Sequence, residues 1–339
     1  MKNLFAFLTV FLSTLVACTK DCIDGELYDI KDFPTIYPSA DTDISYILNK
    51  DTLRILSLGN SYTEDYTKYI ADISESFHDD TRTFCQYNVI RSSASFYTWY
   101  KSIKGTDPTP CYCQRAIGNY EQDIPTGNFP VCDSTLMKEI LSRKWDLIIL
   151  QQASSYANNY NSWNSYRESG YLYQLVSELK ARQSQAAFAF VLIHSYAGGY
   201  KANSERSSMA RWRNIASSAT SLSQDYPIFQ LIIPCGTAIE NLRTSQYNNS
   251  LNITRDGIHL GYGLACMTAG LTFYQTVFAQ RTHNDLSNCP LRHQCSEREL
   301  GIGNKTSHIN VTDENIPIAI SAATSACNNP FDITYTSIN

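Results

Sequence analysis

Residues 53–65 read LRILSLGNSYTED: an apolar run, a Gly-Asn-Ser step and a polar stretch that begins like a helix. The run from Leu53 to Leu58 is mostly apolar, as expected for a strand buried in a sheet. Gly59 permits a tight turn, and Ser61 lies where the strand passes into the helix. This stretch therefore predicts a strand, a sharp turn and a helix, with a small hydroxyl residue at the junction.

The same alternation continues along the chain. Longer segments with helical spacing follow each of four further apolar runs: Phe84–Ile90, Trp145–Leu150, Ala187–Ile193 and Ile228–Ile233. Strands that alternate with helices are connected by right-handed crossovers and form mostly parallel sheets. The sequence therefore predicts an α/β fold with five strands in a mostly parallel sheet.

The first 18 residues, MKNLFAFLTVFLSTLVAC, have the features of an export signal: Lys2, an apolar stretch and then small residues. Residues 15–18, Leu-Val-Ala-Cys, resemble the lipobox of bacterial lipoproteins, in which the cysteine, here Cys18, becomes lipidated. An ordinary cleaved signal with an incidental cysteine is the alternative. Thr19 stands where an inner-membrane lipoprotein usually has Asp. We therefore expect an extracytoplasmic protein anchored by lipid to the bacterial outer membrane, on either face.

The remaining chain is predicted to contain a tether and one folded domain. Residues 19–50 have no sustained hydrophobic period, which is typical of a tether. Residues 51–339 are long enough for one large domain. Within that domain we expect an irregular insertion at about 281–310 and a C-terminal helix at about 312–327.

Composition excludes some classes of function. The chain has 27 Lys and Arg against 32 Asp and Glu, a net charge of −5, and its basic residues are scattered. A nucleic-acid binder would show a basic patch, so no nucleic acid is expected as a partner. Ten cysteines besides Cys18 predict several disulfides in an exported protein, with the pairing left open. Cys111 and Cys113 lack the spacing of metal ligands, and neither a metal nor a cofactor is predicted.

Two sequence segments supply candidate catalytic groups. Ser61 follows the first strand, at the edge of a parallel sheet where ligands bind. His259 and Asp256 stand in RDGIHLG, residues 255–261, after the fifth strand. An Asp three residues before a His can receive the imidazole N–H and stabilise the imidazolium when a serine loses its proton. A helix cap at Asn60 or Ser61, and a loop with an unrelated D-x-x-H, are the alternatives.

Three more residues are candidates for substrate binding. His194 follows the fourth strand at the same edge, and Asn60 precedes Ser61. Tyr156 belongs to a Tyr- and Asn-rich stretch, residues 154–174, whose aromatic and amide groups suit sugar rings. A structural histidine and surface tyrosines without a role are the alternatives.

These segments together resemble a known family. The Gly-Asn-Ser step, the segment WDLIILQQAS at residues 145–154 and the D-x-x-H before a large apolar helix are similar to the SGNH branch of the GDSL esterase/lipase superfamily. The similarity is greatest to an uncharacterised group, common in gut Bacteroidetes, that has Gly-Asn-Ser in the first block. The resemblance implies a flavodoxin-like three-layer αβα sandwich. It also implies that Ser61 is the nucleophile, His259 the general base and acid, and Asp256 its orienting carboxylate.

The resemblance also implies an oxyanion hole. Its donors would be the backbone N–H groups of Ser61 and Ser93 and a side-chain amide of Gln151 or Gln152. Related proteins usually have a Gly-Gly pair near Ser93 and an Asn at the glutamine position, so this chain departs from the family at both places.

The expected function is that of a serine esterase. It would cleave an O-acetyl or similar acyl group from a carbohydrate through an acyl-enzyme on Ser61, without metal or cofactor. Its partners would be the acylated substrate and, through Cys18, a membrane. Two alternatives stay open: a glycan-binding lipoprotein weakened in catalysis, favoured by Ser92 and Ser93, and a lipid or peptidoglycan deacylase with the same triad.

Overall fold

The structure is a computed structural model, and it describes residue 44 and residues 50–78, 84–106, 109–118, 124–197, 208–247 and 253–336. A seven-stranded sheet with the order β4-β3-β2-β1-β5-β6-β7 forms its centre. The strands are β1 (Leu53–Gly59), β2 (Phe84–Ile90), β3 (Cys111–Ile117), β4 (Gly127–Phe129), β5 (Leu147–Leu150), β6 (Ala187–Val191) and β7 (Phe229–Ile233). All pairs from β2 to β7 in this order are parallel, and β3 and β4 add an antiparallel edge.

The α/β fold with a mostly parallel sheet is confirmed, and the five predicted strands are present, but the predicted strand number is wrong. The antiparallel strands β3 and β4 were not expected. In β3, the buried residues Cys111, Cys113 and Ile117 alternate with more exposed ones, so the strand has no continuous apolar run. Strands that are buried on one face show a period of two instead.

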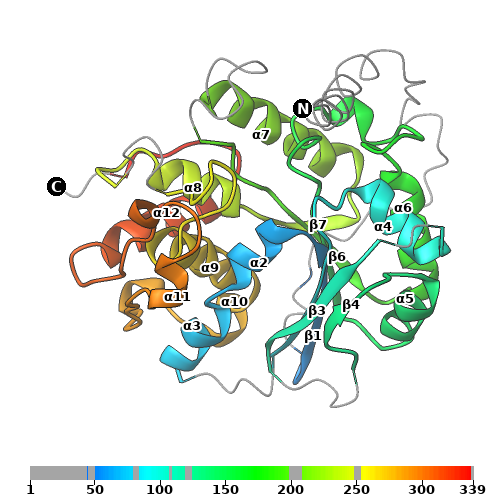
Figure 1. The fold of residues 1–339 in the computed structure, drawn as a ribbon, viewed down its shortest axis with the longest axis horizontal. Helices are drawn as coiled ribbons and strands as arrows, with labels where there is room; N and C mark the ends of the chain where they lie inside the picture. The colour runs from blue at the N-terminus through cyan, green and yellow to red at the C-terminus, as the bar shows by residue number, and fades with distance from the viewer. Residues whose placement is uncertain are drawn as a thin grey trace, which may run out of the picture.

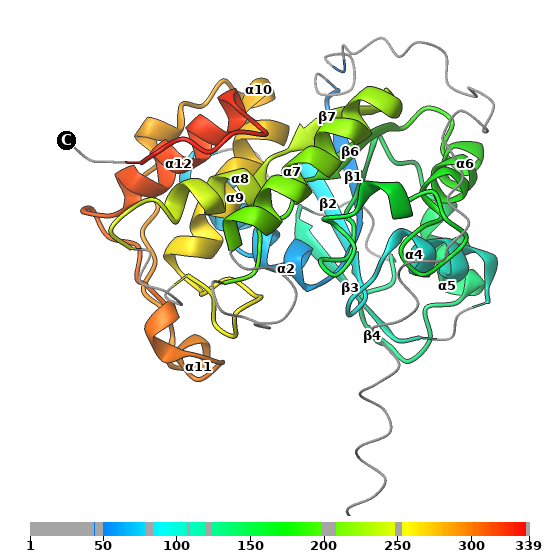
Figure 2. The same cartoon turned by 90° about the horizontal axis from the view of Figure 1, so that it is seen from above.

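Helices cover both faces of the sheet (Figure 1). On one side lie α2 (Ser61–Thr67), α3 (Ile70–Ser76), α8 (Cys235–Leu242), α9 (Leu264–Val277) and α12 (Ile316–Asn328). On the other side lie α4 (Phe96–Lys104), α5 (Ser134–Leu141) and α6 (Leu172–Arg182). Helix α7 (Ser208–Asp225) packs beside β7, as Figure 2 shows from above. The remaining described helices are short: η2 (Tyr160–Ser162), α10 (Ala279–Thr282), η3 (Leu286–Asn288), α11 (Glu297–Leu300) and η4 (Lys305–Ser307).

Helix α9 is the centre of its layer. Nearly every residue of this helix is buried, and it packs against α2, α3, α8 and α12. A helix that is apolar all round is expected in such an interior position. This packing places α2, which begins at Ser61, directly beside the helix that follows the D-x-x-H loop.

The cysteines differ from their prediction. The nine cysteines in the described part of the chain are free thiols, and eight of them are buried. The disulfides that an exported protein led us to expect are therefore not formed among these residues. The predicted signal sequence with Cys18, and nearly all of the predicted tether, lie outside the described residues. Among the helices that are described, none has the length and apolar character needed to cross a bilayer.

Glu299 connects the irregular segment after α9 to the nucleophile side of the fold. One carboxylate oxygen accepts a hydrogen bond from the Tyr69 hydroxyl (3.1 Å), and the other accepts from the Ser296 backbone N–H (2.8 Å) and lies 3.2 Å from His293 Nε2. Burial opposes ionisation, but the bonds from Ser296 and the charge of His293 lower the pKa of Glu299 from 4.5 to about 2. The ionised carboxylate therefore stabilises this segment.

We expect Glu299→Gln to lower the free energy of unfolding by about 1.5–3 kcal/mol at pH 7, because bonds to a charged acceptor are lost. A group whose pKa is depressed by folding contributes its stability above its unfolded pKa and loses it as pH falls. The gap between wild type and variant should thus narrow at pH 3. Thermal unfolding at both pH values measures this, with the exposed neighbour Glu297→Gln as control. An unchanged midpoint for Glu299→Gln at pH 7 would contradict it.

Candidate active site

Ser61 follows a tight turn in which Gly59, two residues before it, packs closely against helix α2. Strand β1 ends at Gly59, Asn60 caps helix α2 by accepting a hydrogen bond from the Tyr62 backbone N–H (3.0 Å), and Ser61 is the first helical residue. A Cβ on Gly59 would lie 2.0 Å from Thr63 Oγ1 and 2.7 Å from Thr63 Cβ. The close approach of strand and helix therefore fixes where the Ser61 hydroxyl emerges.

We expect Gly59→Ala to lower the free energy of unfolding by about 1–3 kcal/mol, because an extra methyl group overpacks the turn against Thr63. The displaced turn should also move Ser61. Gly301→Ala is a matched control, since its added Cβ would meet no atom closer than 3.4 Å and its φ is −82°. Denaturant unfolding compares the two variants, and equal midpoints would show that the turn at Gly59 tolerates a side chain.

Three side chains from two distant parts of the chain form one hydrogen-bonded line. Ser61 Oγ lies 2.7 Å from His259 Nε2, and His259 Nδ1 lies 2.5 Å from Asp256 Oδ2. With the ring proton on Nδ1, His259 donates to Asp256, and Nε2 is left to accept the proton of the Ser61 hydroxyl. The arrangement can therefore activate a serine as a nucleophile.

The electrostatics of the site favour a charged Asp256. The Asp256 side chain also accepts hydrogen bonds from the backbone N–H groups of Ile258 (2.9 Å) and His259 (2.7 Å). Partial burial raises the pKa of Asp256, but the bonds from His259 and these amides outweigh it and lower the pKa below its ordinary value. An ionised Asp256 holds the imidazole in the orientation that Ser61 needs. The His259 side chain is 25% exposed, so a substrate can reach the line from solvent.

His194 does not line this site, contrary to the expectation that it binds substrate. It is fully buried, with Nδ1 2.7 Å from the Tyr66 hydroxyl and Nε2 2.7 Å from the Ile258 carbonyl oxygen. Burial lowers its pKa well below the ordinary value, so the ring is neutral. Its ring also packs against Tyr62, with centroids 4.5 Å apart. Through its contact with the Ile258 carbonyl oxygen, His194 therefore supports the loop that carries His259.

The amides expected in the oxyanion hole are occupied elsewhere. Gln151 donates to Asn60 Oδ1 (2.7 Å) and accepts from the Thr63 hydroxyl (2.6 Å), while Asn60 Nδ2 donates to the Ala94 carbonyl (3.3 Å). Gln152 donates to the Ser169 carbonyl (2.9 Å). Gln151, Gln152 and Asn60 are all at least 98% buried. The hydrogen bonds of Gln151 and Asn60 thus join the ends of β1 and β5 to the loop that follows β2.

Ser93 has the backbone conformation that glycine prefers. Its φ is +53°, in the left-handed region, and both Ser92 and Ser93 are exposed. A non-glycine residue in this region costs about 1–2 kcal/mol. The position therefore keeps the geometry of a glycine turn although a side chain is present.

Tyr156, the remaining predicted substrate contact, is half-buried, and its hydroxyl donates a hydrogen bond to Glu168 (3.2 Å).

One group of side chains has the donor atoms of a metal site. The ligand atoms of His293, Cys295 and Glu299 lie within 4.8 Å of one another. The Glu299 oxygens already accept from Tyr69 and Ser296, however, and Lys68 Nζ lies 3.6 Å from the same carboxylate. A cation would have to compete with these donors for Glu299. The cluster is therefore a hydrogen-bonded contact between the segment after α9 and the residues around Tyr69.

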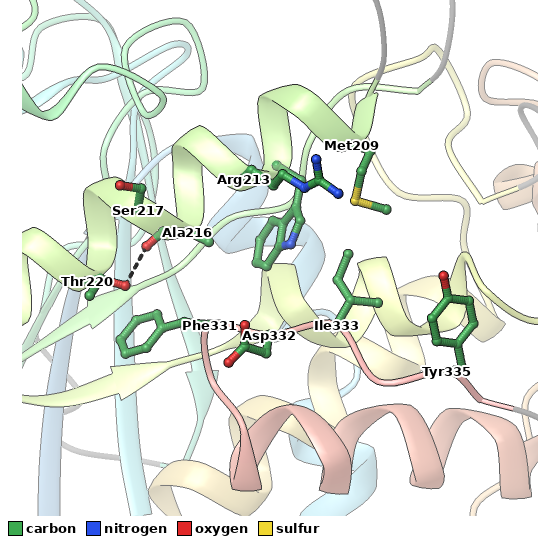
Figure 3. A pocket seen from close by; sticks show the side chains of 10 residues that line it. Met209, Arg213, Ala216, Ser217, Thr220, Phe331, Asp332, Ile333 and Tyr335 are labelled. Atoms are coloured by element: carbon green, nitrogen blue, oxygen red, sulfur yellow. Dashed lines mark hydrogen bonds between the residues drawn. The ribbon is translucent and has the colours of Figure 1, made fainter.

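A cavity of about 600 Å³ lies away from the Ser61 line. Figure 3 shows Met209 and Arg213 on α7 facing Ile333 and Tyr335 in the segment after α12. None of its lining residues belongs to the line of Ser61, His259 and Asp256. The cavity therefore does not extend the candidate active site.

Comparisons with known proteins place the chain in a family. A family model described as a domain of unknown function, DUF4886, matches residues 54–307. The chain belongs to the DUF4886 family. The crystal structure of a DUF4886 protein from Bacteroides uniformis ATCC 8492 is similar in fold, with 23% identity and a TM-score of 0.60, covering 84% of this chain and 98% of that one.

A second solved structure is more distant. It is a protein from Slackia heliotrinireducens that is provisionally assigned as an SGNH hydrolase, with 16% identity and a TM-score of 0.42, covering 66% of this DUF4886 chain and 98% of that one. No curated protein matches the chain. The function must therefore be argued from the site itself.

Asp65 and Arg255, to which the sequence patterns assigned no role, form an ion pair beside the loop that carries Asp256 and His259. Asp65, in α2, accepts hydrogen bonds from Arg255 (2.8 Å) and from the Leu260 backbone N–H (2.9 Å). Asp65 is buried, one helical turn after Ser61. A buried carboxylate on an otherwise apolar helix face was the available signal, because such a group needs a partner.

Proposed function

We propose that this DUF4886 protein is a serine hydrolase of SGNH type that cleaves carboxylic esters. The observation that carries the proposal is the line from Ser61 through His259 to Asp256, with distances of 2.7 and 2.5 Å. Nucleophile, base and orienting carboxylate within hydrogen-bond reach are what acyl transfer by a serine requires. The similarity of the Gly-Asn-Ser step and the D-x-x-H segment to SGNH hydrolases supports the same function.

In the first half of the proposed reaction, His259 Nε2 takes the hydroxyl proton as Ser61 Oγ attacks the ester carbonyl carbon. The bond to the alcohol oxygen then breaks, and His259 returns the proton to the leaving alcohol. In the second half, His259 takes a proton from water, whose oxygen attacks the acyl carbon. The carboxylic acid leaves, and Ser61 regains its proton.

The negative charge on the carbonyl oxygen would be met by backbone donors. We assign this role to the N–H groups of Ser61 and Ser93, the latter supported by its left-handed conformation. Since Gln151 and Gln152 are committed to other partners, the hole has fewer side-chain donors than the resemblance implies. Losing one donor costs about 10²–10³ in rate, so a modest turnover number is expected.

The substrate that we propose is an O-acetyl or similar short acyl group on a carbohydrate. The export signal predicted for residues 1–18 and the family resemblance support this substrate class. The anchor at Cys18 and placement at the outer membrane belong to the same proposal. The exposed Ser92 and Ser93 and the half-buried Tyr156 are the polar groups that we propose as sugar contacts.

Covalent labelling tests the proposed nucleophile without knowledge of the substrate. A fluorophosphonate reacts with a serine only where a base and an oxyanion hole activate it. We expect one phosphonyl adduct per chain, located on the peptide that contains Ser61 by mass spectrometry. Labelling should disappear after heat denaturation. An unlabelled folded protein, or an adduct on another serine, would refute the proposed mechanism.

A further inference from the structure

We propose that Asp65 is a positioning residue: it ties the loop that carries Asp256 and His259 to the helix that begins with Ser61, and so fixes the distance between nucleophile and base. This inference rests on the proposed function. It adds a component that the Ser-His-Asp line does not contain, because the two oxygens of Asp65 accept hydrogen bonds from Arg255 and Leu260.

Asp65 makes two separate bonds to the loop. Oδ1 accepts from Arg255 Nη1 at 2.8 Å, and Oδ2 accepts from the backbone N–H of Leu260 at 2.9 Å. Arg255 directly precedes Asp256, and Leu260 directly follows His259. The two bonds therefore hold both ends of the four-residue segment that supplies the base and its carboxylate.

The loop is itself closed between the same two points. The Arg255 backbone N–H donates to the His259 carbonyl oxygen (2.8 Å), and the Arg255 guanidinium donates to the Leu260 carbonyl oxygen. The guanidinium also lies over the Tyr262 ring, 4.8 Å from its centroid, and the Asn304 N–H donates to the Arg255 carbonyl oxygen (2.6 Å). These contacts hold the segment together, and Asp65 connects it to α2.

This connection bears directly on the chemistry. Ser61 and Asp65 are separated by one turn of the same helix, so their relative positions are fixed by α2. A bond from Asp65 to the loop therefore sets the position of His259 relative to Ser61. Misplacement of a reacting group by about 1 Å can lower a rate by roughly 10²-fold.

Burial makes the connection strong and sensitive to its partners. The Asp65 side chain is 2% exposed and that of Arg255 is 11% exposed. Burial raises the pKa of Asp65 to about 6, against the lowering effect of Arg255 and His259. A buried carboxylate can stay ionised only where charged and backbone groups donate hydrogen bonds to it, as Arg255 and Leu260 do here.

The test compares Asp65→Asn with Glu64→Gln, which makes the same change of charge at the exposed neighbouring residue of α2. With 4-nitrophenyl acetate, Asp65→Asn should lower kcat by roughly 10–100-fold and change KM by less than about twofold, because the base is displaced and not the substrate contacts. Amide hydrogen exchange of the peptide containing Leu260 should become faster by a similar factor in Asp65→Asn alone.

The outcomes separate this inference from the proposed function. An active wild type with full kcat in Asp65→Asn would overturn the inference and leave the function intact. A wild type that hydrolyses no ester would remove the function, and exchange at Leu260 would still decide whether Asp65 holds the loop: unchanged exchange overturns the inference. Should Asp65→Asn not fold, Arg255→Gln is used instead, since it removes the guanidinium that donates to Asp65 Oδ1, and it must show the same two effects.

Discussion

Ser61→Ala is expected to abolish ester hydrolysis, with kcat lowered by roughly 10⁴–10⁶-fold and KM little changed. The alanine removes the only oxygen placed 2.7 Å from His259 Nε2 in the described site, and no acyl-enzyme can form. Because the hydroxyl is half-buried and caps nothing, the fold should be unaffected. Initial rates with 4-nitrophenyl acetate, together with thermal unfolding of both proteins, measure the effect.

Ser217→Ala provides the matched control for this experiment. Ser217 is an exposed serine on α7 that lines the cavity in Figure 3, away from the Ser61 line. This variant should keep the wild-type rate, which would show that the Ser217 hydroxyl takes no part in hydrolysis. Equal loss in both variants, or full activity in Ser61→Ala, would remove Ser61 from the mechanism.

The parallel part of the fold could be predicted from the sequence because its signal is local. Strands such as Ala187–Val191 are buried on both faces, so they read as continuous apolar runs. The convergence of Ser61 and His259, 198 positions apart, also followed from local signals, because the ends of parallel strands meet at one edge. The strands β3 and β4 lack such runs, and they are defined by antiparallel pairing, β3 with β2 and β4 with β3.

The orientation of amide side chains could not be predicted in the same way. Gln151 has the donors that an oxyanion hole needs, but Asn60 and Thr63 offer it partners inside the turn. A buried amide must satisfy its hydrogen bonds, and which partners it finds depends on tertiary packing. The same holds for His194. Its position at the sheet edge suggested a substrate contact, but its two ring nitrogens form hydrogen bonds with the Tyr66 hydroxyl and the Ile258 carbonyl oxygen.

The turn between β1 and α2 contains both structural hydrogen bonds and the proposed nucleophile. The hydrogen bonds among Asn60, Gln151 and Thr63 hold the strand and helix together beneath Ser61. The side-chain amides of Asn60 and Gln151 are therefore used within the turn, and the proposed mechanism assigns charge stabilisation to backbone groups. In the proposed mechanism, the backbone N–H of the exposed Ser93, whose φ is +53°, is the second donor.

Asp256→Asn is expected to lower kcat by roughly 10⁴-fold while the fold is retained. The wild-type carboxylate only accepts hydrogen bonds, so it requires the His259 proton on Nδ1 and leaves Nε2 free to take the proton of Ser61. An asparagine amide can donate to Nδ1 instead. The proton then moves to Nε2, where it blocks the transfer from Ser61.

The pKa of Asp256 sets the pH range of this comparison. Because hydrogen bonds from His259 and two amides lower that pKa below its ordinary value, Asp256 stays ionised as pH falls toward 5. Protonation of Asp256 should therefore not limit the wild-type rate between pH 5 and 8, and the variant should be slower throughout this range. Asp313→Asn, at a side chain that is 88% exposed, is the matched control. If Asp256→Asn kept more than a tenth of the wild-type kcat, the carboxylate would not orient the base, and the hydrolase would work with Ser61 and His259 alone.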